Sequence, residues 1–121
     1  MQDVINANPG DDLRIYVVWI DILRSDDKYS AYLRSTEFDD PRVTYYWDRY
    51  KLTGAEWREV IDIDNVAWDI YFLYGPDSQW GDLPSYPDFF MNQIGLPQEM
   101  SPRLDGDVLA QKIKSMVAEI E

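Results

Sequence analysis

The stretch RIYVVWI at residues 14–20 decides the fold class of this chain, because its last six residues form a continuous apolar run. Continuous rather than alternating apolar residues are typical of a strand that is covered on both faces. The preceding residues 1–13 are polar and end in the turn-like Pro9-Gly10-Asp11-Asp12. We therefore expect an N-terminal arm over residues 1–13 and one domain over residues 14–121.

Three further strands are expected downstream. Residues 42–48 place Val43, Tyr45 and Trp47 on one face of a strand. Residues 68–74 form an aromatic, apolar run that ends at a Gly-Pro pair, and residues 88–94 follow a loop rich in Asp, Gly and Pro. Because the last two strands are close enough in sequence, we expect them to pair as a hairpin.

Helical signals separate most of these strands. Asp26 favours a helix start by its charge, Thr53 and Glu56 have the spacing of a capping box, and Asp105 is the expected N-cap of the last helix. The apolar stripe of that last helix repeats at helical spacing: Leu109, Ile113, Met116, Val117 and Ile120. The element order β-α-β-α-β-β-α predicts an α/β domain with a four-stranded mixed sheet and flanking helices, in which a right-handed crossover makes the first two strands parallel.

Composition excludes several chemistries before any site is sought. The 121 residues include no cysteine and no histidine, so neither a thiol–disulfide pair nor a serine–histidine nucleophile can form. The net charge is −12, with only 11 Lys and Arg residues, which argues against nucleic acid and anionic membranes as partners. We expect a redox-inactive protein with no cofactor, no nucleic-acid partner and no membrane association. A cytoplasmic location is predicted, with a processed secreted form as the alternative.

Short motifs sharpen the predicted architecture: YWD at 46–48, VAWDIY at 66–71, YGP at 74–76 and MNQIG at 91–95. With the element order, they resemble an uncharacterised family of bacterial thioredoxin-like proteins that lack the CxxC redox pair. The resemblance implies a minimal thioredoxin-like fold over residues 14–120. It also implies a histidine at the position of Asn92 and a cis-proline before the third strand, and this chain departs from both.

Four aspartates are expected to meet at one edge of the predicted sheet. Asp21 and Asp26 follow the first strand, Asp48 ends the second, and Asp69 begins the third, which runs back to the same edge. Open α/β sheets bind ligands at the carboxyl ends of their strands. Tryptophans directly precede two of these aspartates, at Trp47 and Trp68. The sequence thus predicts an edge that is both acidic and aromatic.

This constellation allows more than one chemistry. An acidic, aromatic edge suits an ammonium or guanidinium group, or a protein segment that carries one. It also suits a divalent metal ion held by oxygen ligands, and Asp48 with Asp69 could act as a pair of catalytic carboxylates. The alternative without any ligand is that the aspartates cap helices and stay solvated. Trp80, in the loop before the fourth strand, either contacts a partner or packs back over the sheet.

We predict a binding domain rather than a catalyst, one that recognises a protein segment or cationic group at the acidic, aromatic edge. The competing prediction is an enzyme or divalent-metal site that uses Asp48 and Asp69. The expected state is a monomer or a weak homodimer, the latter formed through an exposed sheet edge.

Overall fold

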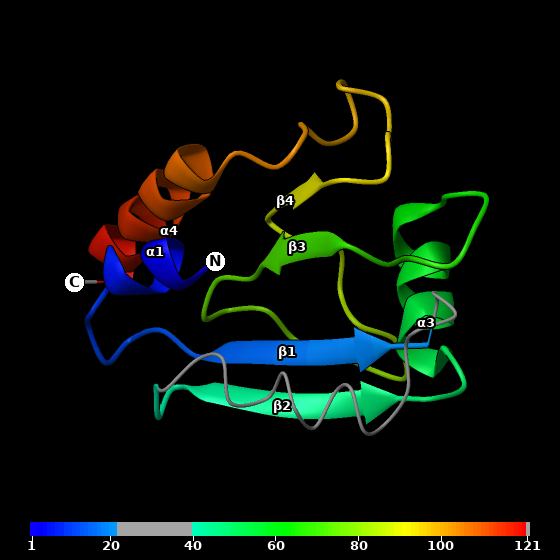
Figure 1. The fold of residues 1–121 in the computed structure, drawn as a ribbon, viewed down its shortest axis with the longest axis horizontal. Helices are drawn as coiled ribbons and strands as arrows, with labels where there is room; N and C mark the ends of the chain where they lie inside the picture. Colours follow the sequence, from blue (N-terminus) through cyan, green and yellow to red (C-terminus); the bar gives the residue numbers. More distant parts are fainter. Residues whose placement is uncertain (22–39, 121) are drawn as a thin grey trace. The chain divides into compact units, whose positions relative to one another are not determined.

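A computed structural model describes residues 1–21 and 40–120 of the chain. Asp26 and the helix predicted to begin there lie outside the described residues. The elements follow in the order α1 (Gln2–Asn6), β1 (Ile15–Ile20), β2 (Val43–Asp48), α3 (Leu52–Ile61), β3 (Ile70–Leu73), β4 (Phe89–Asn92) and α4 (Gly106–Ile120) (Figure 1).

The chain divides into two compact units. Residues Leu13–Trp68 form one of them, called here the inserted unit because it interrupts the other in sequence. The terminal unit combines Met1–Asp12 with Asp69–Glu121. Each unit contains one small sheet, and the two are described separately below.

The predicted four-stranded mixed sheet is wrong: the strands form two sheets of two strands each. β1 and β2 pair in parallel in the inserted unit, from Ile15 opposite Val43 to Ile20 opposite Asp48. β3 and β4 pair antiparallel in the terminal unit, with Ile70 opposite Asn92. The parallel pairing of β1 with β2 and the hairpin of β3 and β4 were therefore predicted correctly. The prediction that these four strands form one minimal thioredoxin-like sheet is wrong.

Two local features explain the difference. Asp69 has a φ of 51°, a left-handed conformation that ends the extended backbone, so β3 starts at Ile70 and is only four residues long. β4 uses its other edge to pair with the chain that follows it, because Asn92 forms a parallel bridge with Arg103. β1 is also not covered on both faces, since Tyr16 is 65% exposed.

The inserted unit packs α3 closely against the residues that follow it. Gly54, in the first turn of α3, is buried, and its carbonyl accepts a hydrogen bond from the Ala67 N–H at 3.0 Å. A Cβ atom at this position would lie 2.7 Å from Ile20 Cδ1 and 2.8 Å from the Ala67 oxygen, and would also overlap Val66. Only glycine allows this approach.

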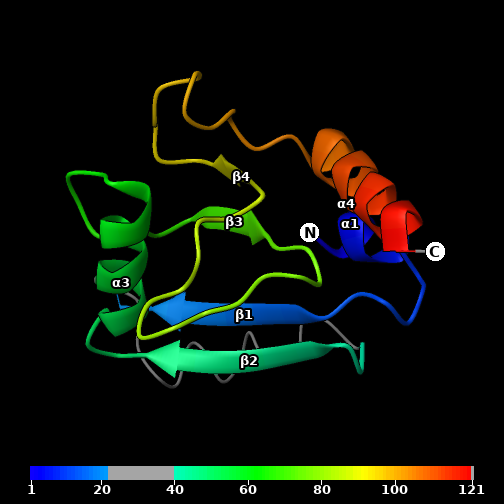
Figure 2. The same ribbon diagram turned by 180° about the vertical axis from the view of Figure 1, so that it is seen from behind.

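The core of the terminal unit lies between its helices and its hairpin. α1 packs beside α4, as both views of the ribbon show (Figures 1 and 2). The buried amide of Asn8 donates to the Val4 oxygen at 3.3 Å and to the Ala110 oxygen at 3.1 Å, which joins the two helices. α1 was not predicted from the sequence, which indicated only a polar arm before residue 14. The buried apolar residues of this unit are Val4, Ile5, Phe90, Met91, Leu109, Ala110 and Ile113.

Asn92 forms a network of hydrogen bonds in the terminal unit and is 2% exposed. Its Nδ2 donates to the Ser101 oxygen and Oγ, both at 3.0 Å, and lies 3.3 Å from the Pro102 oxygen. Its Oδ1 accepts from the N–H groups of Ile94 and Leu96, each at 3.2 Å. The amide therefore uses both of its ends to tie β4 to the segment that leads to α4.

Gly54→Ala should overpack the contact with Val66 and the backbone oxygen of Ala67, at a cost of about 2–3 kcal/mol. Alanine regains about 1 kcal/mol in a helix interior, so the free energy of unfolding should fall by about 1–2 kcal/mol. The control is Gly106→Ala, at the start of α4, where the new Cβ would lie 3.7 Å from Val4 Cγ2 and cause no clash. Urea unfolding of both variants makes the comparison, and a Gly54→Ala protein as stable as wild type would contradict the packing argument.

Asn92→Asp should cost about 3–5 kcal/mol at neutral pH, because it places a charge against carbonyl oxygens that now accept hydrogen bonds. The loss should become smaller in acid, where the new carboxyl is protonated. The melting temperature of this variant is compared with that of Asn65→Asp, which makes the same change in charge at an exposed position. Equal melting temperatures for the two variants would show that the buried amide contributes little.

Candidate functional site

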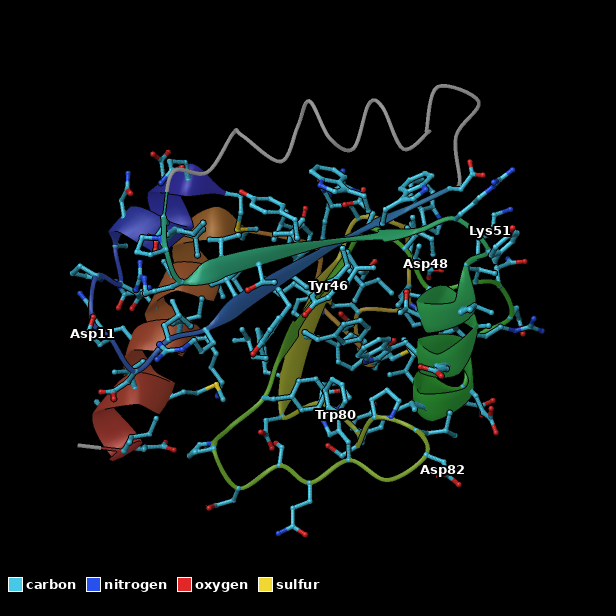
Figure 3. The ribbon with its side chains drawn as sticks, turned by 90° about the horizontal axis from the view of Figure 1, so that it is seen from below. Asp11, Tyr46, Asp48, Lys51, Trp80 and Asp82 are labelled. Atoms are coloured by element: carbon cyan, nitrogen blue, oxygen red, sulfur yellow. The ribbon has the colours of Figure 1, made fainter. Side chains whose placement is uncertain are left out.

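Asp48, the end of β2, caps the helix that follows it. Its carboxylate accepts from the N–H groups of Leu52 at 2.9 Å and Thr53 at 2.8 Å, and from the Thr53 hydroxyl (Figure 3). The predicted N-cap, Thr53, is wrong: α3 begins at Leu52, and its N-cap position is Lys51, which makes no side-chain cap. Both carboxylate oxygens of Asp48 are thereby occupied by α3.

The ionisation of Asp48 follows from these contacts. Burial alone would raise the pKa of this carboxyl, but the hydrogen bonds from Thr53 and from the backbone N–H groups of Leu52, Thr53 and Gly54 lower it below its ordinary value of 3.8. Asp48 is therefore charged and is satisfied inside its own unit, which is the arrangement of a structural cap.

Three more of the predicted site residues lie in the inserted unit: Asp21, Trp47 and Trp68. Asp21 follows β1, and its N–H donates to the Asp48 oxygen at 3.3 Å, so the ends of β1 and β2 are joined through the backbone. Trp47 and Trp68 are each half-buried.

Asp69 belongs to the terminal unit and contacts residues there. Its Oδ1 accepts from Gln93 Nε2 at 3.0 Å and from the Tyr71 hydroxyl at 3.3 Å, and its backbone oxygen accepts from the Gln93 N–H at 3.1 Å. Burial raises the pKa of Tyr71, and the negative charge of Asp69 raises it further. Since Asp48 and Asp69 lie in different units, their predicted convergence stays a prediction.

Trp80 lies in a loop that joins β3 to β4 in the terminal unit, called here the acidic loop (residues 74–88) (Figure 3). Hydrogen bonds close the base of this loop. The Tyr74 hydroxyl donates to the Ser85 oxygen at 2.6 Å, the Gly75 N–H donates to Asp88 Oδ2 at 2.6 Å, and the Asp88 N–H donates to the Leu73 oxygen at 3.0 Å. These hydrogen bonds fix the two ends of the loop to each other.

The acidic loop exposes two large aromatic side chains. Trp80 is 53% exposed and stands edge-on to Tyr74, with ring centroids 5.2 Å apart and planes at 64°. Tyr86 is 59% exposed and contacts Phe90 edge-on, with centroids 6.0 Å apart. Each ring is steadied by a second aromatic ring and still presents about half of its surface to solvent. Trp80 was predicted from the sequence, whereas Tyr86 was not among the predicted site residues.

Several other features bear on function. Within residues 1–21 and 40–120, no three acidic side chains gather closely enough to hold a metal ion. None of the helices in the described part of the chain has the length and apolar character that a membrane span requires. Comparisons with protein-family models, with curated proteins and with solved structures found no match.

Asp48→Asn should lower the free energy of unfolding by about 1–2 kcal/mol at neutral pH, because the amide turns an N–H donor toward the donors of α3. The folded-state pKa of Asp48 is lowered, so its stabilisation is present above pH 3.8 and is lost as the pH falls through the lowered value. The gap between wild type and variant should therefore close in strong acid. Urea unfolding over a pH series measures this, with the exposed Asp64→Asn as control. A gap that does not change with pH would contradict the charged cap.

Proposed function

We propose that this protein is a binding module and that its acidic loop takes a segment of protein rich in lysine and arginine. The observation that carries the proposal is the pair of exposed rings, Trp80 and Tyr86, on a loop fixed by hydrogen bonds at its base. Aromatic residues on a rigid loop bind with little loss of conformational entropy, since few torsions remain to be frozen.

Charge selects the kind of partner. No lysine or arginine occurs between residues 59 and 102, whereas this stretch contains eight acidic residues. Three of them, Asp77, Asp82 and Asp88, lie in the acidic loop, and all three are exposed. Figure 3 shows Asp82 extending outward from the loop. A basic segment would meet carboxylates here without meeting a like charge from the same stretch of chain.

The contacts favour a cationic side chain over a neutral one. An ammonium or guanidinium group over an exposed indole contributes about 0.5–1 kcal/mol, and each exposed ion pair contributes a similar or smaller amount. A dissociation constant of 1 mM already corresponds to about 4 kcal/mol, so two or three such contacts give binding weaker than millimolar. The function supported is therefore weak, reversible recognition that gains strength when several basic residues bind together.

The competing use of Asp48 and Asp69 as a metal or catalytic pair has less support. A cation at Asp48 would have to displace hydrogen bonds that stabilise α3, and this carboxylate is 9% exposed. The acidic loop needs no such rearrangement.

The test is a titration of the full chain with a lysine- and arginine-rich peptide, followed by nuclear magnetic resonance of the indole N–H groups. We expect Trp80→Ala to weaken binding roughly two- to fivefold, the share of one cation–π contact. Asp82→Asn should weaken it less, and added salt should weaken binding to every variant. The control is Val108→Ala, an apolar residue of α4 that is 48% exposed in the same unit. Equal binding of a neutral peptide, or unchanged binding by Trp80→Ala, would refute the proposal.

A further inference from the structure

The turn between β2 and α3 carries positive charge, the opposite of the acidic loop. Residues 49–52, called here the basic turn, read Arg-Tyr-Lys-Leu. Tyr50 is 74% exposed and Leu52 is 64% exposed, the first with the Arg49 guanidinium 5.5 Å from its ring centroid. Two basic groups and two apolar side chains thus stand together on the surface of a chain whose net charge is −12.

The basic turn has a fixed shape. Lys51 adopts φ 59°, a left-handed conformation that a residue with a side chain adopts only when its surroundings enforce it. The enforcing contacts are the hydrogen bonds from Leu52 and Thr53 to the Asp48 carboxylate, together with the Ala55 N–H bonded to the Lys51 oxygen at 3.0 Å. Because these contacts exist before any partner arrives, binding through the turn pays little to order its backbone.

We propose that the basic turn of one copy binds the acidic loop of a second copy. This inference rests on the proposed function, because it names the basic segment that the acidic loop takes. Arg49 and Lys51 supply the positive charge, and Asp77 and Asp82 of the other copy supply the negative charge. Tyr50 supplies an exposed ring for Trp80, a pairing of side chains that is common at the centres of interfaces.

Net charge opposes this association, and salt decides which effect dominates. At about 0.15 M salt the Debye length is about 8 Å, so repulsion between charges on the far sides of two copies is screened while ion pairs in contact persist. At about 0.01 M the Debye length is about 30 Å and repulsion dominates, whereas at about 1 M it is about 3 Å and the contact pairs weaken as well. Self-association is therefore strongest at intermediate salt.

The contact pairs two unlike surfaces, and each copy offers one of each. In a two-fold symmetric dimer both pairs of surfaces meet at once, whereas a one-sided contact leaves one basic turn and one acidic loop unused in every pair, which allows further copies to add. Wild type is therefore expected to form dimers or larger species whose population rises with protein concentration.

The test uses two neutralised variants and sedimentation velocity at several protein and salt concentrations. Arg49→Gln/Lys51→Gln removes the charge of the basic turn, and Asp77→Asn/Asp82→Asn removes the charge of the acidic loop. Each variant alone should be monomeric. Their equimolar mixture should form dimers and nothing larger, because one intact turn and one intact loop remain per pair. Wild type should self-associate, most strongly at intermediate salt.

The outcomes separate the two proposals. A monomeric wild type that still binds the basic peptide overturns the self-association and leaves the proposed function standing. A monomeric wild type that binds no peptide overturns both. Self-association that survives both pairs of substitutions also overturns the inference, since it must use another surface. Circular dichroism and the melting temperature of each variant confirm that none of these results comes from unfolding.

Discussion

The buried amide of Asn92 ties the hairpin of the terminal unit to the segment that leads to α4. Asn92 lies at the end of β4, and its side chain bonds to residues of this segment, which contains no helix or strand. Ser101 extends the network by donating to the Phe90 oxygen at 2.8 Å. Such a network stabilises a fold only while every member is paired, because an unpaired polar group in this position costs more than its bond contributes. The hairpin and the start of α4 depend on this pairing.

The aspartates described above fall into two groups. Asp48 caps the first turn of α3, and Asp69 accepts hydrogen bonds from Tyr71 and Gln93. Asp77 and Asp82 lie exposed in the acidic loop, which also carries the exposed ring of Trp80. A carboxylate that satisfies backbone donors stabilises the fold, whereas an exposed carboxylate on a loop with an exposed ring is available to a partner. For this reason the proposed binding site is the acidic loop and not the sheet edge that the sequence predicts.

Local patterns predicted more of this molecule than long-range ones. The parallel pairing of β1 with β2, the hairpin and the N-cap Asp105, whose carboxylate accepts from the Asp107 N–H at 3.0 Å, all follow from nearby residues. The single sheet failed because pairing between distant strands depends on strand length and edges, which the left-handed backbone at Asp69 alters. The cap by Asp48 was missed because it reaches four residues forward across a left-handed Lys51. Trp80 was singled out because the flanking turn residues predict a loop, and the structure places it there with 53% of its surface exposed.

The hydrogen bond from Asn8 to Ala110 joins residues 102 positions apart. During synthesis on the ribosome, α1 emerges before the inserted unit, and α4, which covers its apolar side, emerges after it. The inserted unit, by contrast, is one continuous stretch of chain in which β1 and β2 pair with each other. Since contacts distant in sequence form slowly, Val4 and Ile5 stay uncovered until α4 has been made. The nascent chain therefore carries an exposed apolar helix, prone to aggregation, for as long as the inserted unit is being synthesised.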